Sequence, residues 1–303
     1  MTKLFSFFAL VGVFLYACPA YAEMTSTNFK IRWDSVSTGG SDTASSLNYG
    51  LRDSVGGTQT GTSISENHQL SAGYRAGLFD ELITFEILPQ DTTSQKAVSA
   101  RSGLTISTSD TSGISIGDYI VLVQDKGVNQ ISAVGKVTSI VSGSSVTVDS
   151  WSDNGTTPTI DGSNDYYSSL SGSSIAFGTL NSSSVSTAVI AFEVTAELDN
   201  GYSVQIMQSG NLSNGSHEIT PVSDGAVTAG NEEYGARSSD TSLANSTFDT
   251  ADTAITSSFQ DVATESLRKF SDRHFVTLKA SVLPSTPSGT YSQAITLIAS
   301  GNF

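Results

Sequence analysis

The fold is decided by one stretch, Ala188-Val189-Ile190-Ala191-Phe192-Glu193-Val194-Thr195-Ala196-Glu197-Leu198. Every second residue from Ala188 to Leu198 is apolar, whereas the residues between them become polar along the run. Because successive side chains of a β-strand point to opposite faces, this alternation predicts a half-buried strand. We therefore expect Phe192 to face a hydrophobic core and Glu193 to face solvent.

Turn signals and further strands follow this stretch. Asp199-Asn200-Gly201 is a turn of the Asn-Gly kind that hairpins prefer, and it predicts that residues 202–207 return as the neighbouring strand. Residues 275–282 and 290–299 are two more strands, joined by a turn that contains prolines. The one helical candidate is 261–270, where we expect a loop with a single helical turn. The pattern predicts an all-β fold, with an Ig-like β-sandwich over residues 79–91 and 172–303.

A long stretch interrupts this sandwich. Residues 82–88 have the pattern of its first strand and residues 174–180 that of the continuation, yet about 80 residues separate them. Three short strands are predicted inside the gap, at 117–123, 135–140 and 145–148. Because a structureless loop of that length is improbable, we expect residues 92–171 to form a small, barrel-like β module inserted into the sandwich.

An internal repeat occupies residues 23–78. Three copies share the form Ser-x-Asn-aromatic-x-aliphatic, with His68 as the third aromatic: Ser26-Thr27-Asn28-Phe29-Lys30-Ile31, Ser46-Leu47-Asn48-Tyr49-Gly50-Leu51 and Ser65-Glu66-Asn67-His68-Gln69-Leu70. The aromatic and the aliphatic residue are two apart, so they share one face of a strand. Each copy therefore predicts a strand followed by a glycine turn, and a disordered polar leader is the alternative.

The N-terminus has the features of an export signal. Lys3 precedes an almost continuous apolar run from Leu4 to Ala17, and Ala20-Tyr21-Ala22 places small residues before a cleavage site. We expect residues 1–22 to be a signal peptide and the protein to be extracellular or at the cell surface. No transmembrane segment is predicted after its removal. Leu15-Tyr16-Ala17-Cys18 resembles a lipobox, so a lipoprotein anchored at Cys18 is the alternative to cleavage after Ala22.

The composition excludes some classes of partner. The 303 residues include 14 Lys+Arg against 29 Asp+Glu, a net charge of −15, and also 53 serines and 34 threonines. An acidic chain without a basic cluster is unsuited to nucleic acid, so no nucleic-acid partner is expected. The abundance of Ser and Thr, with few charged residues, favours β structure over a helical cytosolic enzyme.

The sequence offers few residues for catalysis. His68, His217 and His274 are far apart, and no H-E-x-x-H or C-x-x-C accompanies them. We therefore expect the protein not to be an enzyme, and we predict no catalytic, cofactor-binding or metal-binding residue. The acidic residues between Asp153 and Asp165 offer oxygen ligands suited to Ca²⁺, but without the spacing of an EF-hand. A calcium loop is thus the alternative to a solvated turn.

Several motifs together resemble a known kind of protein. The signal peptide, the repeats ending at Ser71-Ala72-Gly73-Tyr74-Arg75 and the closing segment from Pro287 to Leu297 resemble uncharacterised secreted bacterial surface proteins. The closing segment is also similar to the last strands of Ig-like, pilin-like and spore-coat-type sandwiches. The resemblance implies an exported structural or adhesive component of the bacterial envelope, with no catalytic residues to transfer.

These observations favour a secreted structural protein, a subunit of a fibre or envelope layer that associates with itself or with other envelope components by strand addition. The predicted inserting side chains are those of Phe29, Ile31, Tyr49 and Leu51. One alternative is a carbohydrate-binding adhesin that stacks glycans on exposed aromatic side chains, namely Trp33, Trp151, Tyr166 or Tyr167. Another is an outer-membrane barrel, which the alternating residues before Phe303 resemble.

Overall fold

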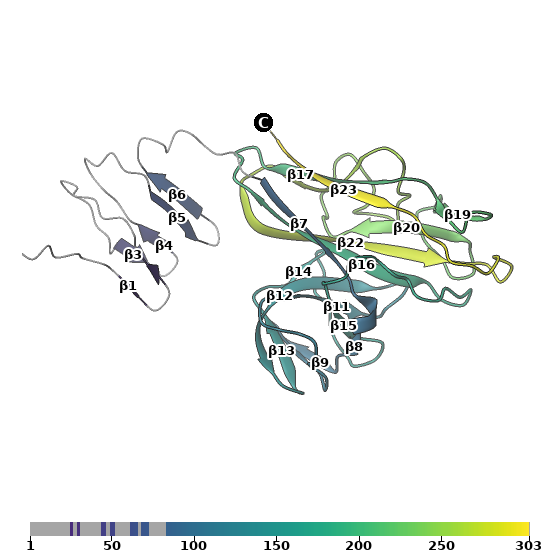
Figure 1. Ribbon diagram of the computed structural model, residues 1–303, viewed down its shortest axis with the longest axis horizontal. Helices are drawn as coiled ribbons and strands as arrows, with labels where there is room; N and C mark the ends of the chain where they lie inside the picture. The colour runs from purple at the N-terminus through teal and green to yellow at the C-terminus, as the bar shows by residue number, and fades with distance from the viewer. Residues whose placement is uncertain are drawn as a thin grey trace, which may run out of the picture. The chain divides into compact units, whose positions relative to one another are not determined.

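The computed structural model describes residues 83–302 in full and, before them, the backbone of six short strands between residues 25 and 72 (Figure 1). The chain divides into two units, Met1–Phe79 and Asp80–Phe303. The strands of the first unit are β1 (Thr25–Ser26), β2 (Phe29–Lys30), β3 (Ala44–Ser46), β4 (Tyr49–Leu51), β5 (Gly61–Ser65) and β6 (His68–Ala72). Ile31, and the side chains of all six strands, lie outside the described residues.

The first unit contains three antiparallel strand pairs, β1 with β2, β3 with β4, and β5 with β6. In every pair the Ser of the repeat motif is the direct partner of the aromatic residue or histidine three positions later, as in Ser26 with Phe29 and Ser46 with Tyr49. The expectation of one strand followed by a glycine turn is therefore wrong. Each motif spans two paired strands, and the Asn falls between them, where tight hairpin connections favour this residue.

The second unit contains a two-sheet sandwich, so the prediction of an all-β fold is confirmed. The larger sheet has six strands, β18-β19-β20-β22-β16-β7, and the smaller has three, β21-β17-β23. The six are β7 (Ile83–Pro89), β16 (Ser186–Ala196), β18 (Leu212–Ser213), β19 (Glu218–Pro221), β20 (Glu233–Ser238) and β22 (Lys269–Ser281). The three are β17 (Tyr202–Gln208), β21 (Gln260–Glu265) and β23 (Ile295–Gly301).

The main hydrophobic core lies between these two sheets. From β16 it receives the residues that the alternation predicted to face inward, including Ile190, Phe192 and Val194. Tyr202, Val204 and Ile206 of β17 pack against them from the other sheet. Phe192 is completely buried, so its expected place in the core is correct.

The turn after β16 does not form a hairpin. β16 pairs with β22 and β7, whereas β17 pairs with β21 and β23, so the chain crosses from one sheet to the other at Gly201. Gly201 has a φ of 72°, and a Cβ atom there would lie 2.0 Å from the carbonyl oxygen of Glu265. The two last strands, which the sequence predicted to be joined by a turn with prolines, do not pair with each other either, since β22 and β23 belong to different sheets. The alternation of apolar and polar residues is the same whichever sheet a strand joins, so it does not identify the neighbouring strand.

Two other expectations about the sandwich are also corrected. Residues 174–180 form no strand, although Ile175 and Phe177 pack their side chains against the main core from a loop. The segment 261–270 contains no helical turn, because it comprises most of β21 and the start of β22. Apolar and polar residues alternate only weakly in this segment, and β21 is held in a strand by its pairing with β17.

A separate sheet of eight strands occupies residues 96–169 and is called the module below. Its strands are β8 (Lys96–Ala97), β9 (Ala100–Ser102), β10 (Thr105–Ser107), β11 (Tyr119–Gln124), β12 (Ile131–Val141), β13 (Ser145–Val148), β14 (Ser152–Asp153) and β15 (Tyr166–Ser169). The short 3-10 helix η1 (Thr92–Ser94) precedes it. β8 pairs with β15 and β9 pairs with β10, so the nearly continuous segment 96–102 closes the sheet on itself around a core of its own.

The module lies on the outer face of the six-stranded sheet, so the second unit has three layers (Figure 1). Val121, Val123 and Val134 of the module pack against Val189 and Ala191 of β16. β7 precedes the module and β16 follows it, and these two strands are paired neighbours. β16 is therefore buried on both faces rather than half-buried.

Candidate functional site

The free edge of β23 is the first candidate site. β23 pairs with β17 on one side, and no described strand pairs with its other side. The hydrogen bonds from Ser209 N to Ala294 O (2.9 Å) and from Asn302 N to Gly201 O (3.0 Å) fix which residues face β17. Because bonded and non-bonded pairs alternate in an antiparallel ladder, Leu297 and Ala299 direct their N–H and C=O groups outward.

This edge differs from the other sheet edges. β23 has seven residues, Ile295–Gly301, with neither a charge nor a proline. In contrast, β21 carries Asp261 and Glu265, β18 has only two residues, and β7 ends at Pro89, whose carbonyl accepts a bond from Gly172 N (2.9 Å). Charges, prolines and shortness are the usual protections of an edge, and β23 has none of them.

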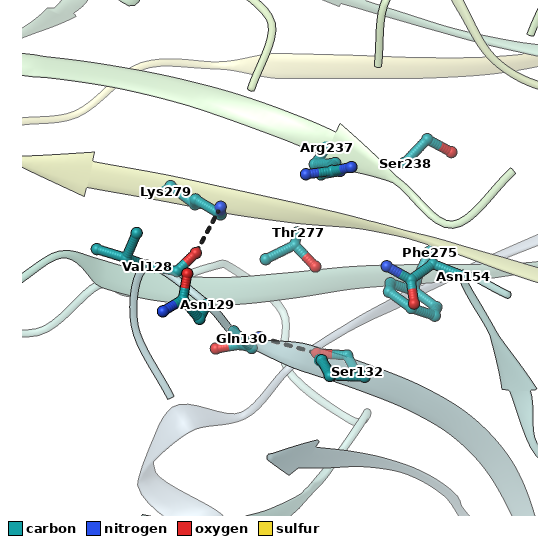
Figure 2. A pocket seen from close by; sticks show the side chains of 11 residues that line it. Val128, Asn129, Gln130, Ser132, Asn154, Arg237, Ser238, Phe275, Thr277 and Lys279 are labelled. Carbon is teal, nitrogen blue, oxygen red and sulfur yellow. Dashed lines mark hydrogen bonds between the residues drawn. The ribbon is translucent and has the colours of Figure 1, made fainter. Parts of the chain in front are cut away.

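The second candidate site is a cavity of about 240 Å³ between the module and the outer face of the six-stranded sheet (Figure 2). The module contributes residues that follow β11, begin β12 and follow β14, and β20 and β22 form the opposite wall. The lining residues are Val128, Asn129, Gln130, Ile131, Ser132, Asn154, Arg237, Ser238, Phe275, Thr277 and Lys279. They include two cations and no carboxylate.

Ionic and polar contacts hold the walls of this cavity in place. The ammonium of Lys279 donates to the carbonyl oxygen of Val128 (3.0 Å) and forms a buried ion pair with Asp252 (2.9 Å). Gln130 donates to the Ser132 hydroxyl (2.9 Å) and accepts from the Thr187 hydroxyl of β16 (2.5 Å). The charge of Lys279 is therefore already neutralised.

Three other polar side chains in the cavity have no partner among the residues that the structure describes. Arg237 makes no hydrogen bond or ion pair there. Thr277, directly opposite Arg237 in the β20–β22 ladder, is only 7% exposed, and its hydroxyl makes no hydrogen bond within the described chain. The Oδ1 atom of Asn154 is buried and lacks a partner among those residues. Figure 2 shows all three along the cavity wall.

An ion-pair network next to this cavity joins the module to the sandwich. The guanidinium of Arg273 on β22 donates to Glu193 of β16 (2.8 Å) and to both carboxylate oxygens of Asp149 in the module. Tyr119 donates its hydroxyl to Glu193 (3.0 Å). Burial would lower the pKa of Arg273, but its bonds to the two carboxylates raise that pKa above its usual value. Burial opposes ionisation of Asp149, yet hydrogen bonds from Arg273 and Lys136 hold its pKa below the usual value.

A cluster of Glu265, Asp272 and His274 brings potential metal ligands close together. The ammonium of Lys269 lies 3.2 Å from Glu265 and 3.9 Å from Asp272, and the Tyr202 hydroxyl donates to Asp272 (2.9 Å). A lysine thus already supplies the positive charge that these carboxylates need.

The two histidines with described side chains lie in different clusters. His217 pairs with Glu232 (2.7 Å), whereas His274 lies beside Glu265 and Asp272, and the side chain of His68 is not described. The side chains of the predicted assembly residues Phe29, Ile31, Tyr49 and Leu51 also lie outside the described part. Of the suggested sugar platforms, Tyr167 is fully buried and cannot stack on a glycan, and Trp33 is not described.

The acidic residues considered for Ca²⁺ are used in their own turns. Asp165 accepts hydrogen bonds from the backbone N–H groups of Asp161 and Gly162 (both 2.9 Å). Asp153 accepts from Gly155 N (2.9 Å). A calcium loop stays the untested alternative to a solvated turn.

Arg237, Thr277 and Asn154 could not be identified from the sequence. No local pattern marks residues that meet only in the folded chain, such as the β20–β22 neighbours Arg237 and Thr277.

No protein-family model matches the sequence, and no curated protein or solved structure is significantly similar to it. Within the described residues, no helix is long and apolar enough to cross a membrane.

Proposed function

We propose that the protein is an exported structural subunit of a cell-surface or extracellular assembly, in which a strand of a neighbouring copy adds to the free edge of β23. The observation that carries this proposal is the edge itself. Seven residues without charge or proline present outward-facing N–H and C=O groups at Leu297 and Ala299. An edge of this kind is a template for pairing with another chain.

The open side of the sandwich also suits an added strand. Ile295 and Leu297 of β23, together with Ile83 and Phe85 of β7, pack against the main core but remain only half-buried. A strand placed along β23 would cover this apolar surface, and each Å² removed from water contributes about 25 cal/mol.

The proposed occupant is a strand from residues 23–77 of a second copy. The six strands of that segment have two to five residues and pair only within their own hairpins. Isolated two-stranded hairpins are marginally stable in water, so these strands would gain stability by joining a larger sheet. Phe29, Ile31, Tyr49 and Leu51 are the side chains proposed to insert.

The test is the substitution Ala299→Pro in the full-length chain. Proline removes an N–H that faces away from β17, so it blocks an added strand while the ladder to β17 remains complete. We expect the wild type to form oligomers in sedimentation velocity at high concentration and Ala299→Pro to be monomeric, with a similar melting temperature. Ile298→Pro is the matched control, since it removes a bond to β17 and should lower the melting temperature.

Deleting residues 23–77 identifies the donor. Loss of association in both the deletion and Ala299→Pro supports the proposal. Association that persists in the deletion but not in Ala299→Pro would show that another strand, such as a second β23, occupies the edge. A wild-type chain that stays monomeric at high concentration would refute assembly altogether.

A further inference from the structure

The unpartnered groups of the cavity point to a ligand. A buried hydroxyl or amide without a hydrogen bond costs about 1 to 3 kcal/mol, so native proteins rarely leave several of them together. Here the Oδ1 of Asn154 is fully buried and lacks a partner within the described chain. The guanidinium of Arg237, which is half-buried, and the hydroxyl of Thr277 line the same cavity and also make no hydrogen bond with the described residues. The surrounding walls are tied by Lys279 and Gln130, so the cavity is already formed.

The charges favour an anion. Lys279 is neutralised by Asp252, which leaves Arg237 as an uncompensated cation in a cavity without any carboxylate. This arrangement is conspicuous in a chain of net charge −15, whose acidic residues would otherwise supply a partner. The planar guanidinium matches a carboxylate group, to which it can donate two parallel hydrogen bonds.

Size and the remaining groups narrow the class of ligand. A volume of about 240 Å³ is below the roughly 300 to 1,000 Å³ of drug-sized pockets, and it suits a single sugar ring. Thr277 can both donate and accept a hydrogen bond, and the Asn154 amide can face either way, so both suit ligand hydroxyls. Phe275 supplies an apolar surface for the C–H face of a ring.

We propose that this cavity binds a sugar acid, a monosaccharide-sized carboxylate that carries hydroxyl groups. Arg237 holds the carboxylate, and Thr277 and Asn154 hold the hydroxyls. The module and the six-stranded sheet each contribute part of the site, so a bound ligand stabilises the folded second unit. This inference does not depend on strand addition at β23.

The experiment uses the full-length protein with D-galacturonate as the probe and D-galactose and acetate as comparisons, followed by titration calorimetry and thermal melting. We expect galacturonate to bind and to raise the melting temperature. Galactose and acetate should bind more weakly by at least about tenfold, because galactose lacks the carboxylate and acetate lacks the hydroxyl groups. Arg237→Gln should weaken galacturonate binding by about tenfold or more. Arg268→Gln removes the same charge at a residue that pairs with Asp199 outside the cavity, and it should leave binding unchanged.

Thr277→Val separates binding from folding. Valine keeps the shape of the side chain and removes a hydroxyl that has no described partner, so the ligand-free protein should be at least as stable as the wild type. Binding of galacturonate should nevertheless fall several-fold. Equal affinity for galacturonate and galactose, equal affinity for galacturonate and acetate, or no binding at all would each overturn the proposal, the last showing that water alone fills the cavity.

Discussion

The two faces of the six-stranded sheet are both covered, but by different means. The inner face meets the three-stranded sheet through apolar side chains such as Phe192 and Val194. The outer face meets the module through Val189 and Ala191, and beside them through the charged groups of Glu193 and Arg273. One strand, β16, therefore contributes to the main core with one face and to the interface with the module with the other.

The two kinds of contact have different energetic consequences. Apolar packing contributes in proportion to the area removed from water and accepts residues of similar volume. A buried ion pair contributes little net stability against an apolar substitute, but breaking it leaves an uncompensated charge. The outer face should therefore select one position of the module, whereas the inner face provides most of the stability.

The largest expected effect is on the inner face. Phe192→Ala should lower the free energy of unfolding by about 3 to 5 kcal/mol, since it removes a large, fully buried side chain from the main core. Urea denaturation measures this change. The control is Thr84→Ala on the exposed part of β7, which should change stability by less than about 0.5 kcal/mol. Similar losses for both variants would contradict the strand register.

On the outer face, Arg273→Ala should cost about 2 to 4 kcal/mol, because it removes the guanidinium that forms ion pairs with both Glu193 and Asp149. The value is below that for a fully buried pair since Asp149 is 28% exposed. Arg273→Met keeps part of the apolar stem and separates lost packing from lost charge. A change below 0.5 kcal/mol, measured by urea denaturation, would show that the network does not hold the module.

A smaller effect is expected at Glu193, which the alternation predicted to face solvent. Glu193→Gln keeps the shape but weakens the bond to Arg273, and it should cost about 1 to 2 kcal/mol. Its control is Glu86→Gln, because Glu86 is the direct partner of Glu193 on β7 and is exposed. If urea melts show equal effects for the two substitutions, Glu193 would behave as a surface residue after all.

The smallest effect concerns pH. The pKa of Asp149 is lower in the folded chain than its usual value, so the folded form binds fewer protons in the acid range. Its stabilising contribution is complete at neutral pH and is lost as the pH falls below about 4 and through the folded pKa. The stability difference between wild type and Asp149→Asn should therefore shrink from pH 7 to pH 3. A difference that is constant over this range would exclude a role for the charge.

The edge and the cavity differ in how far sequence could predict them. The sequence predicted that Ile295 and Leu297 belong to a terminal strand. It did not predict that this strand lies at the edge of a sheet. Arg237 and Thr277 are 40 positions apart in sequence and become neighbours only through the register of β20 and β22. No local pattern encodes such a meeting, because the period of a strand describes its own faces and not its partner.

The sequence by itself determined that the chain is built from strands, where most of its longer strands lie, and that Phe192 belongs in a core. These properties follow from local alternation and turn residues, which act within a few positions. Only the tertiary structure decided that the chain changes sheets at Gly201, that Glu193 meets Arg273, and that Arg237 lines a cavity. The physical reason is that an apolar face can be buried by any complementary surface, whereas the choice of surface depends on contacts between segments distant in sequence.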